Sequence, residues 1–205
     1  ATNSPAPAPA RTGTAASASS STTAPDSLEI PRGSGTVTLS SKQLAIATAI
    51  ITVGRQLGIS DKGVKVALMT ALQESVLRMY ANSSVPESLT YDHDAVGSDH
   101  DSLNPFQQRA GWGSVEERMN LDYSIRAFFG GADGPNGGSP RGLLDIDGWE
   151  SMTPGVAAQT VQVSAYPDAY DKWEAGAEQL ISALGGGIAS GCGTGTISGE
   201  MALPL

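Results

Sequence analysis

The segment from about residue 62 to 79 most constrains the fold, because it is apolar on nearly every side of the expected helix. A helix of this kind is stable in water only when other elements cover it, so it must lie in the middle of a domain. Ser60 and Asp61 are suited to cap its start. The apolar positions are Val64, Val66, Ala67, Leu68, Met69, Ala71, Leu72, Val76 and Leu77.

Helical periodicity continues on both sides of this central segment. Before it, Ser40 and Ser41 offer a cap, and Gly58 is suited to end the preceding helix. Later, Pro154 stands at a first-turn position, where proline is favoured. No segment shows convincing strand alternation, so the sequence predicts an all-α domain with long loops. The other expected helices cover residues 42–57, 115–130, 153–163 and 168–184.

The two ends of the chain differ from its middle in composition. Residues 1–37 are rich in Ala, Ser, Thr and Pro, and residues 185–205 are rich in Gly. Such segments bury too little apolar surface to offset the entropy cost of ordering, so we expect flexible linkers around a domain at 38–184. This arrangement, and a first residue that is not Met, predict a module of a longer multi-domain protein.

Charge and hydropathy limit the classes of partner that we expect for this chain. The net charge of −9 and the isoelectric point near 4.5 argue against nucleic acid. No apolar run reaches the length that a transmembrane helix needs, so no membrane span is expected. Cys192 is the only cysteine, which excludes an internal disulfide.

Glu74 is the most informative single residue, because it is a carboxylic acid on the mostly apolar central helix. An ionised carboxylate without a partner is costly there, so its pKa should be raised. Such a group can donate a proton near neutral pH. A helix-end carboxylate paired with Arg78 is the simpler alternative.

Two further motifs follow Glu74-Ser75. A long loop at about 81–114 contains the turn DSLNPFQQ at 101–108, and Ala165-Tyr166 precedes the last helix. In this order the three motifs resemble the lytic transglycosylase branch of the lysozyme-like superfamily. They are especially similar to the modules with LQES and DSLGLFQQR in actinobacterial and actinophage cell-wall proteins. The resemblance covers about residues 40–184. It departs at Asn104-Pro105, where the family has Gly-Leu, and at Pro167, where Asn is common.

The resemblance implies a lysozyme-like helical fold that cleaves the β-1,4 bond between N-acetylmuramic acid and N-acetylglucosamine in peptidoglycan. Glu74 would be the acid and base, and no cofactor or metal would be needed. Glu74, Gln107 and Tyr166 should then line one groove. The residues expected to bind substrate are Ser75, Ser102, Phe106, Gln107, Gln108 and Tyr166.

The reaction outcome stays open at this level. Internal attack by the muramic 6-hydroxyl needs no second carboxylate, whereas hydrolysis needs one to activate water. A non-catalytic glycan-binding or structural module of a phage tail or secreted protein is the alternative function. In either case we expect a location outside the cell or in the cell wall, secreted or virion-associated. The candidate second carboxylates are Asp92, Asp94, Asp99 and Asp101.

Overall fold

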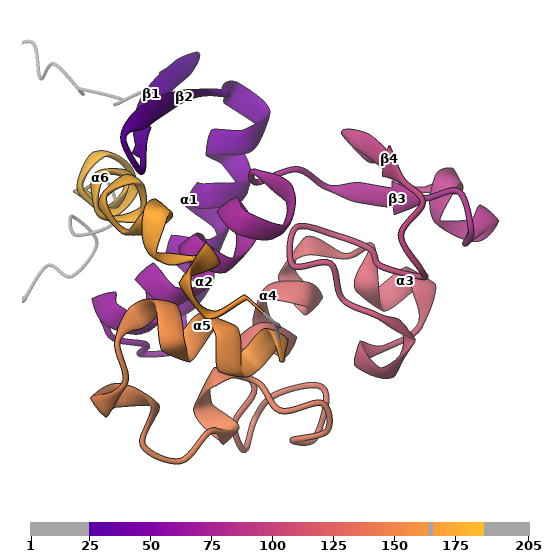
Figure 1. Cartoon of the computed structure of the whole chain (residues 1–205). Coiled ribbons are helices and arrows are strands. Elements are labelled where there is room, and N and C mark those ends of the chain that lie inside the picture. Colours follow the sequence, from indigo (N-terminus) through magenta and orange to yellow (C-terminus); the bar gives the residue numbers. More distant parts are fainter. Residues whose placement is uncertain (1–24, 164–165, 187–205) are drawn as a thin grey trace, which may run out of the picture.

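Five main helices surround a single core in the computed structural model of the chain, which describes residues 25–163 and 166–186 (Figure 1). Among these residues α2 is the central helix, and it packs against each of the other four main helices. Cys192 and most of the two predicted linkers lie outside the described residues. The main helices are α1 (Ser41–Gln56), α2 (Asp61–Ser75), α4 (Leu121–Phe129), α5 (Pro154–Gln162) and α6 (Glu174–Gly185).

The prediction of a buried central helix is confirmed, although α2 ends earlier than expected. Leu68 and Leu72 are fully buried. The Ser60 side chain caps the start by accepting a hydrogen bond from the Gly63 amide. The expected end near residue 79 is wrong, because Val76 and Leu77 both adopt positive φ angles, of 52° and 55°. Two left-handed residues in a row turn the chain away from the helix axis.

The all-α prediction is wrong, because the described part of the chain contains two small sheets and the fold is mixed α and β. Strands β1 (Ser27–Arg32) and β2 (Gly35–Ser40) form an antiparallel hairpin in which Ile30 pairs with Val37. This hairpin occupies the end of the segment expected to be a linker. The domain therefore begins before residue 38.

The hairpin belongs to the core. Ile30 and Leu39 are fully buried, and β1 lies against α6. A Cβ atom at Gly176 of α6 would lie 2.6 Å from the Pro31 carbonyl oxygen, so glycine is required for this close approach. The sequence does carry a strand signal here, since Leu28-Glu29-Ile30 and Thr36-Val37-Thr38-Leu39-Ser40 alternate apolar and polar residues on either side of a Gly-containing turn.

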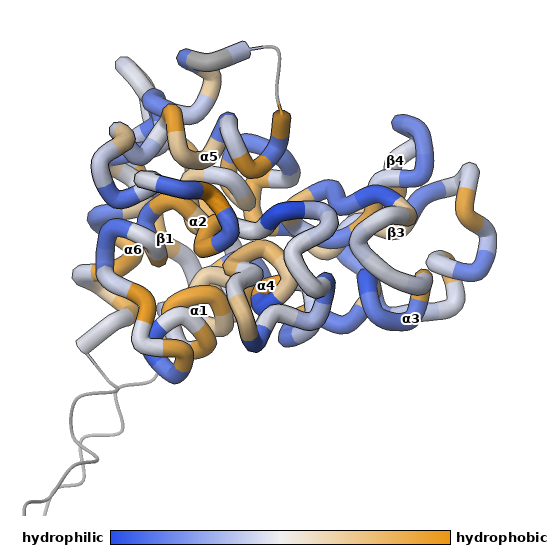
Figure 2. Tube along the Cα trace, turned by 90° about the horizontal axis from the view of Figure 1, so that it is seen from below, coloured by the Kyte–Doolittle hydropathy of each residue, from blue (hydrophilic) through white to orange (hydrophobic). Residues whose placement is uncertain are grey.

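The second sheet lies in the expected long loop. Strands β3 (Tyr80–Asn82) and β4 (Ala95–Gly97) pair in parallel, and they form a separate lobe with α3 (Val115–Arg118), on the right of Figure 1. Figure 2 shows that this lobe is more polar than the helical part of the molecule. The short 3₁₀ helices are η1 (Pro86–Thr90), η2 (Ala110–Trp112), η3 (Leu143–Asp145), η4 (Trp149–Ser151), η5 (Pro167–Ala169) and η6 (Asp171–Trp173).

Two further helices differ from their predicted bounds. The expected helix at 115–130 is split into α3 and α4, because Asn120 caps α4 by accepting a hydrogen bond from the Tyr123 amide. The expected last helix is replaced in its first part by η5 and η6, and α6 starts only at Glu174. Across the described residues, no helix is both long and apolar enough to cross a membrane.

Candidate functional site

Glu74 lies in the last turn of α2 and lines a pocket of about 350 Å³. The pocket lies where residues from α2, the loop after β4 and the end of α5 meet the short segment before α6. We call it the Glu74 pocket, and its volume is at the lower end of those that hold small ligands. The residues that line it are Glu74, Asp99, Ser102, Gln107, Gln162 and Tyr170.

The Glu74 carboxyl is held by Tyr170. The phenol of Tyr170 donates a hydrogen bond of 2.7 Å to Glu74 Oε1, and Tyr170 is only 1% exposed. The segment that carries Tyr170 is fixed to α2 by Trp173, whose indole N–H donates to Gln73 Oε1 at 2.9 Å. Adjacent residues of α2 therefore contact the same segment, which fixes the orientation of the carboxyl.

Burial raises the pKa of Glu74 above its ordinary value, and the hydrogen bond from Tyr170 offsets only part of this increase. Glu74 therefore keeps its proton to a higher pH than an exposed glutamate does. A carboxylic acid that stays protonated and also faces a pocket can donate its proton to a bound ligand.

The backbone around the Glu74 pocket is strained. Within 25–163 and 166–186, six residues other than glycine have positive φ angles, and each lies within three residues of a pocket residue. Such conformations cost on the order of 1–3 kcal/mol each and cluster at functional sites. This clustering supports the Glu74 pocket as the functional site, independently of the motifs. The six are Val76, Leu77, His100, Asn104, Gln107 and Val163.

Gln107 and Ser102 line the Glu74 pocket, as expected. Gln107 has a φ of 54°, and its side-chain amide donates to the Asn104 carbonyl at 3.0 Å. Asn104 itself has a φ of 65°. Asparagine tolerates the left-handed region better than most residues, so it can stand where the similar family has glycine.

Three residues expected to bind substrate are instead buried, and none of them lines the Glu74 pocket. Ser75 is 4% exposed and donates to the Pro105 carbonyl at 2.9 Å. Phe106 is fully buried and stacks on Phe128, with ring centroids 4.7 Å apart. Gln108 is 2% exposed and donates to the Ser124 carbonyl at 2.9 Å. Together these residues hold the second motif against α2 and α4.

Tyr166, which was also expected to bind substrate, is 75% exposed and does not line the Glu74 pocket. Tyr170 is the tyrosine that contacts Glu74. The sequence offered a signal for it, since Tyr170 follows Tyr166 at a helical spacing in AYPDAY. Gln162 was also missed. Its amide donates to the Phe106 carbonyl at 3.1 Å, and it lies on the last turn of α5.

Among the four candidate second carboxylates, only Asp99 lines the Glu74 pocket. Its side chain is 83% exposed, and its Oδ1 lies 2.7 Å from His100 Nδ1. Burial alone would raise the pKa of Asp101, but hydrogen bonds from Arg109 and the Ala110 amide outweigh this and lower it. Asp101 is therefore a structural anion that holds η2 in place.

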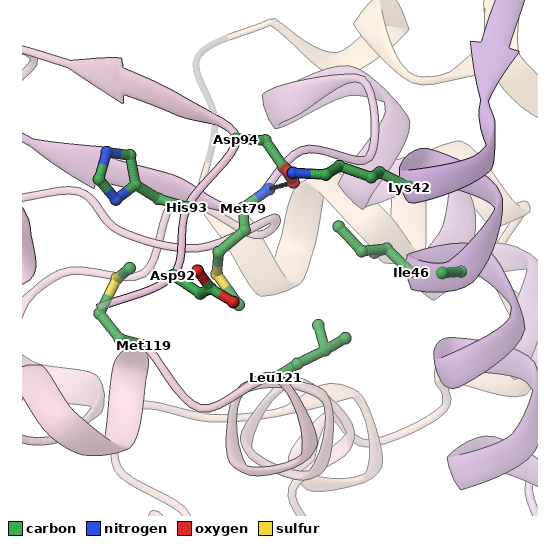
Figure 3. Close-up of a pocket in the computed structure, with 9 residues that line it drawn as sticks. Lys42, Ile46, Met79, Asp92, His93, Asp94, Met119 and Leu121 are labelled. Carbon is green, nitrogen blue, oxygen red and sulfur yellow. Dashed lines mark hydrogen bonds and ion pairs between the residues drawn. The ribbon is translucent and has the colours of Figure 1, made fainter.

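Asp92 and Asp94 line a different pocket, shown in Figure 3, which shares no residue with the Glu74 pocket. Asp94 forms an ion pair of 3.2 Å with Lys42 and accepts a hydrogen bond from the Met79 amide. Within the described segments, no cluster of His, Cys, Asp and Glu is suited to hold a metal ion.

Comparison with protein-family models and with curated proteins finds no match to this chain.

Proposed function

We propose that the protein cleaves the β-1,4 bond between N-acetylmuramic acid and N-acetylglucosamine in peptidoglycan, as a lytic transglycosylase. The observation that carries this proposal is a carboxyl group with a raised pKa, Glu74, in a pocket that contains no buried second carboxylate among its described residues. The surrounding amides and hydroxyls suit a sugar, which presents hydroxyl and acetamido groups. On this proposal the protein acts on the cell wall, outside the membrane.

Glu74 serves first as acid and then as base. Protonated Glu74 donates its proton to the glycosidic oxygen while the bond from that oxygen to C1 of muramic acid breaks. The muramic 6-hydroxyl then attacks C1, and its proton passes to the Glu74 carboxylate. A 1,6-anhydro ring forms, and Glu74 regains its proton, so neither water nor a cofactor is consumed.

Tyr170 has two effects on this chemistry, since its phenol both orients the Glu74 carboxyl and stabilises the carboxylate. A hydrogen bond to a charged group contributes about 1.5–3 kcal/mol, so losing it should reduce the rate about tenfold or more. Loss of this hydrogen bond also leaves the Glu74 carboxylate less stable, so the pKa of Glu74 rises further.

For Tyr170→Phe we therefore expect a kcat/KM about tenfold lower and a fall in activity that begins at higher pH. The acid is active while protonated, so a higher pKa moves the alkaline limb of the profile upward. The measurement is kcat/KM against pH on purified cell walls. Tyr166→Phe is the matched change outside the pocket, for which we expect no shift. An unshifted profile for Tyr170→Phe would contradict the assigned contact.

The products distinguish internal attack from hydrolysis. Mass spectrometry of digested cell walls should show muropeptides ending in 1,6-anhydromuramic acid, about 18 Da lighter than the reducing forms because no water has been added. Asp99→Asn should give the same products at a similar rate, because the exposed Asp99 side chain is paired with His100. Reducing ends that disappear in Asp99→Asn would instead make Asp99 the water-activating carboxylate. Uncut polymer that still binds the protein would favour a glycan-binding module.

A further inference from the structure

A second groove lies beside the polypeptide turn that follows Glu74. It consists of two pockets, of about 300 and 330 Å³, which adjoin because both are lined by Lys42, His93 and Asp94 (Figure 3). We call it the Lys42 groove. Figure 3 shows the first pocket, bounded by α1 on one side and by the start of α4 on another. Nothing in the proposed cleavage chemistry uses this groove.

The charges of the Lys42 groove are arranged along its length. In the middle, Lys42 and Asp94 neutralise each other across 3.2 Å. Arg78 lines only the second pocket and Asp92 only the first, so these two charges lie at different ends. In the part of the chain that the structure describes, neither the Arg78 guanidinium nor the Asp92 carboxylate has a charged or hydrogen-bonding side-chain partner. The groove thus offers a free cation at one end and a free anion at the other.

The pocket at the Asp92 end of the groove has apolar walls, whereas the middle and the Arg78 end are lined by polar residues. Met79 and Met119 line the first pocket together with aliphatic residues of α1 and α4. Methionine side chains adapt to ligands of different shape, because they are unbranched and polarisable. A ligand that fits this groove therefore carries an anion for Arg78 and a cation for Asp92, with small apolar groups near the cation.

The Arg78 end of the groove is close to Glu74. Arg78 is four positions after Glu74, so their Cα atoms lie at most about 15 Å apart even in a fully extended chain. The intervening turn, at Val76 and Leu77, is left-handed and shortens this path. Only a short stretch of chain therefore separates Glu74 from the Arg78 end of the groove.

We propose that the Lys42 groove binds the peptide stem of the glycan strand, a conclusion that rests on the proposed function. The stem is attached to muramic acid and carries small alanine side chains. Its second residue is acidic and its third is commonly a diamino acid, so the carboxylate precedes the amine along the stem. Arg78, the charge nearer in sequence to Glu74, takes the carboxylate, and Asp92 takes the amine. The enzyme would then prefer glycan strands that still bear their peptides.

Peptide binding can be tested without any cleavage. The Glu74→Gln protein, labelled at its methionine methyl groups, is titrated with a synthetic tripeptide of L-alanine, γ-linked D-glutamate and a diamino acid. We expect the signals of Met79 and Met119 to shift and saturate. Met69 is fully buried in the core and Met152 lies outside the groove, so both should stay unchanged. No shift at Met79 and Met119, or an equal shift at Met152, would overturn the proposal.

Charge variants identify the two ends. Arg78→Gln and Asp92→Asn should each weaken peptide binding about fivefold, which is the effect of one solvent-exposed ion pair at its upper limit. Arg141→Gln and Asp147→Asn are matched controls, because both side chains are exposed and outside the groove. Equal affinity in all four variants would contradict the assignment of Arg78 and Asp92.

Cleavage rates separate this inference from the proposed function. Wild-type protein should cleave stem-bearing strands faster than strands whose peptides an amidase has removed, and Arg78→Gln should reduce only the first rate. Equal cleavage rates on both kinds of strand would contradict stem binding in the groove but would agree with the proposed glycosidase activity. Peptide binding without cleavage of either strand would contradict the proposed glycosidase activity. The peptide titration by itself decides whether the groove binds the stem.

Discussion

Replacing Glu74 by glutamine should reduce cleavage of peptidoglycan by about 10²–10⁴-fold, the usual contribution of a positioned acid. Glutamine keeps the shape of the side chain, and its carbonyl oxygen can still accept the hydrogen bond from Tyr170. It has no acidic proton to donate to the leaving oxygen. The measurement is the release of soluble muropeptides from purified cell walls, with Glu150→Gln as a control because Glu150 is exposed.

The same variant should be at least as stable as wild type at neutral pH. A raised pKa in the folded state means that ionising Glu74 costs more in the folded protein than in the unfolded chain. The stability that protonated Glu74 provides is therefore lost as pH rises through the folded pKa. Glutamine cannot ionise, so its advantage should be present at pH 7. It should shrink as pH falls below about 4.3, the ordinary value for glutamate in an unfolded chain. Thermal unfolding at pH 7 and pH 3.5 measures the difference.

A lower melting temperature for Glu74→Gln at pH 7 would contradict this account. Lost activity could then be a consequence of lost structure rather than of the missing proton. A retained melting temperature with retained cleavage would reject Glu74 as the acid.

Replacing Phe106 by alanine should destabilise the fold by about 3–5 kcal/mol, the usual cost of removing a large buried aromatic side chain. Phe106 is fully buried and stacked on Phe128, so its removal leaves a cavity between the second motif and α4. For a domain of this size, that corresponds to a melting temperature lower by roughly 10 °C. Chemical denaturation and thermal unfolding should agree.

Phe106→Leu tests whether Phe106 acts only through packing. Leucine refills most of the cavity, so we expect it to recover most of the stability, and cleavage should recover with it. If Phe106 instead contacted the substrate, Phe106→Leu would stay inactive although stable. That result would restore the role predicted from the motif.

The sequence predicted the central helix and its N-cap well, because these depend on local signals. Val64 to Leu72 are apolar on all sides, Ser60 is a strong N-cap residue, and Thr153-Pro154 marks a helix start. The linker-like composition of residues 1–37 concealed the hairpin at 27–40, although Thr36 to Ser40 alternate polar and apolar residues. Contact of the buried hairpin residues with α6 adds a stabilisation that the sequence does not reveal.

The candidate site was predicted only in part, because the motifs are local signals and the directions of their side chains are not. Glu74 and Gln107 do share a pocket, since each lies at a turn that its motif marks. Motif identity did not reveal which side chains point inward. Ser75, Phe106 and Gln108 are buried in the core, whereas their chain neighbours Glu74 and Gln107 line the pocket. Tyr170 and not Tyr166 reaches Glu74, because η5 and η6 turn the chain before α6.

The strained turns around the Glu74 pocket also limit how small an active version of this protein can be. Asn104 tolerates left-handed backbone, but this backbone is unfavourable for Val76, Leu77 and Val163 in an isolated segment, so these turns have no local reason to form. Each exists only when α2, α5 and the loop after β4 are packed together, since Ser75, Phe106 and Gln162 link these three parts. A peptide or graft that carries the three motifs alone would therefore carry the residues of the site without its geometry.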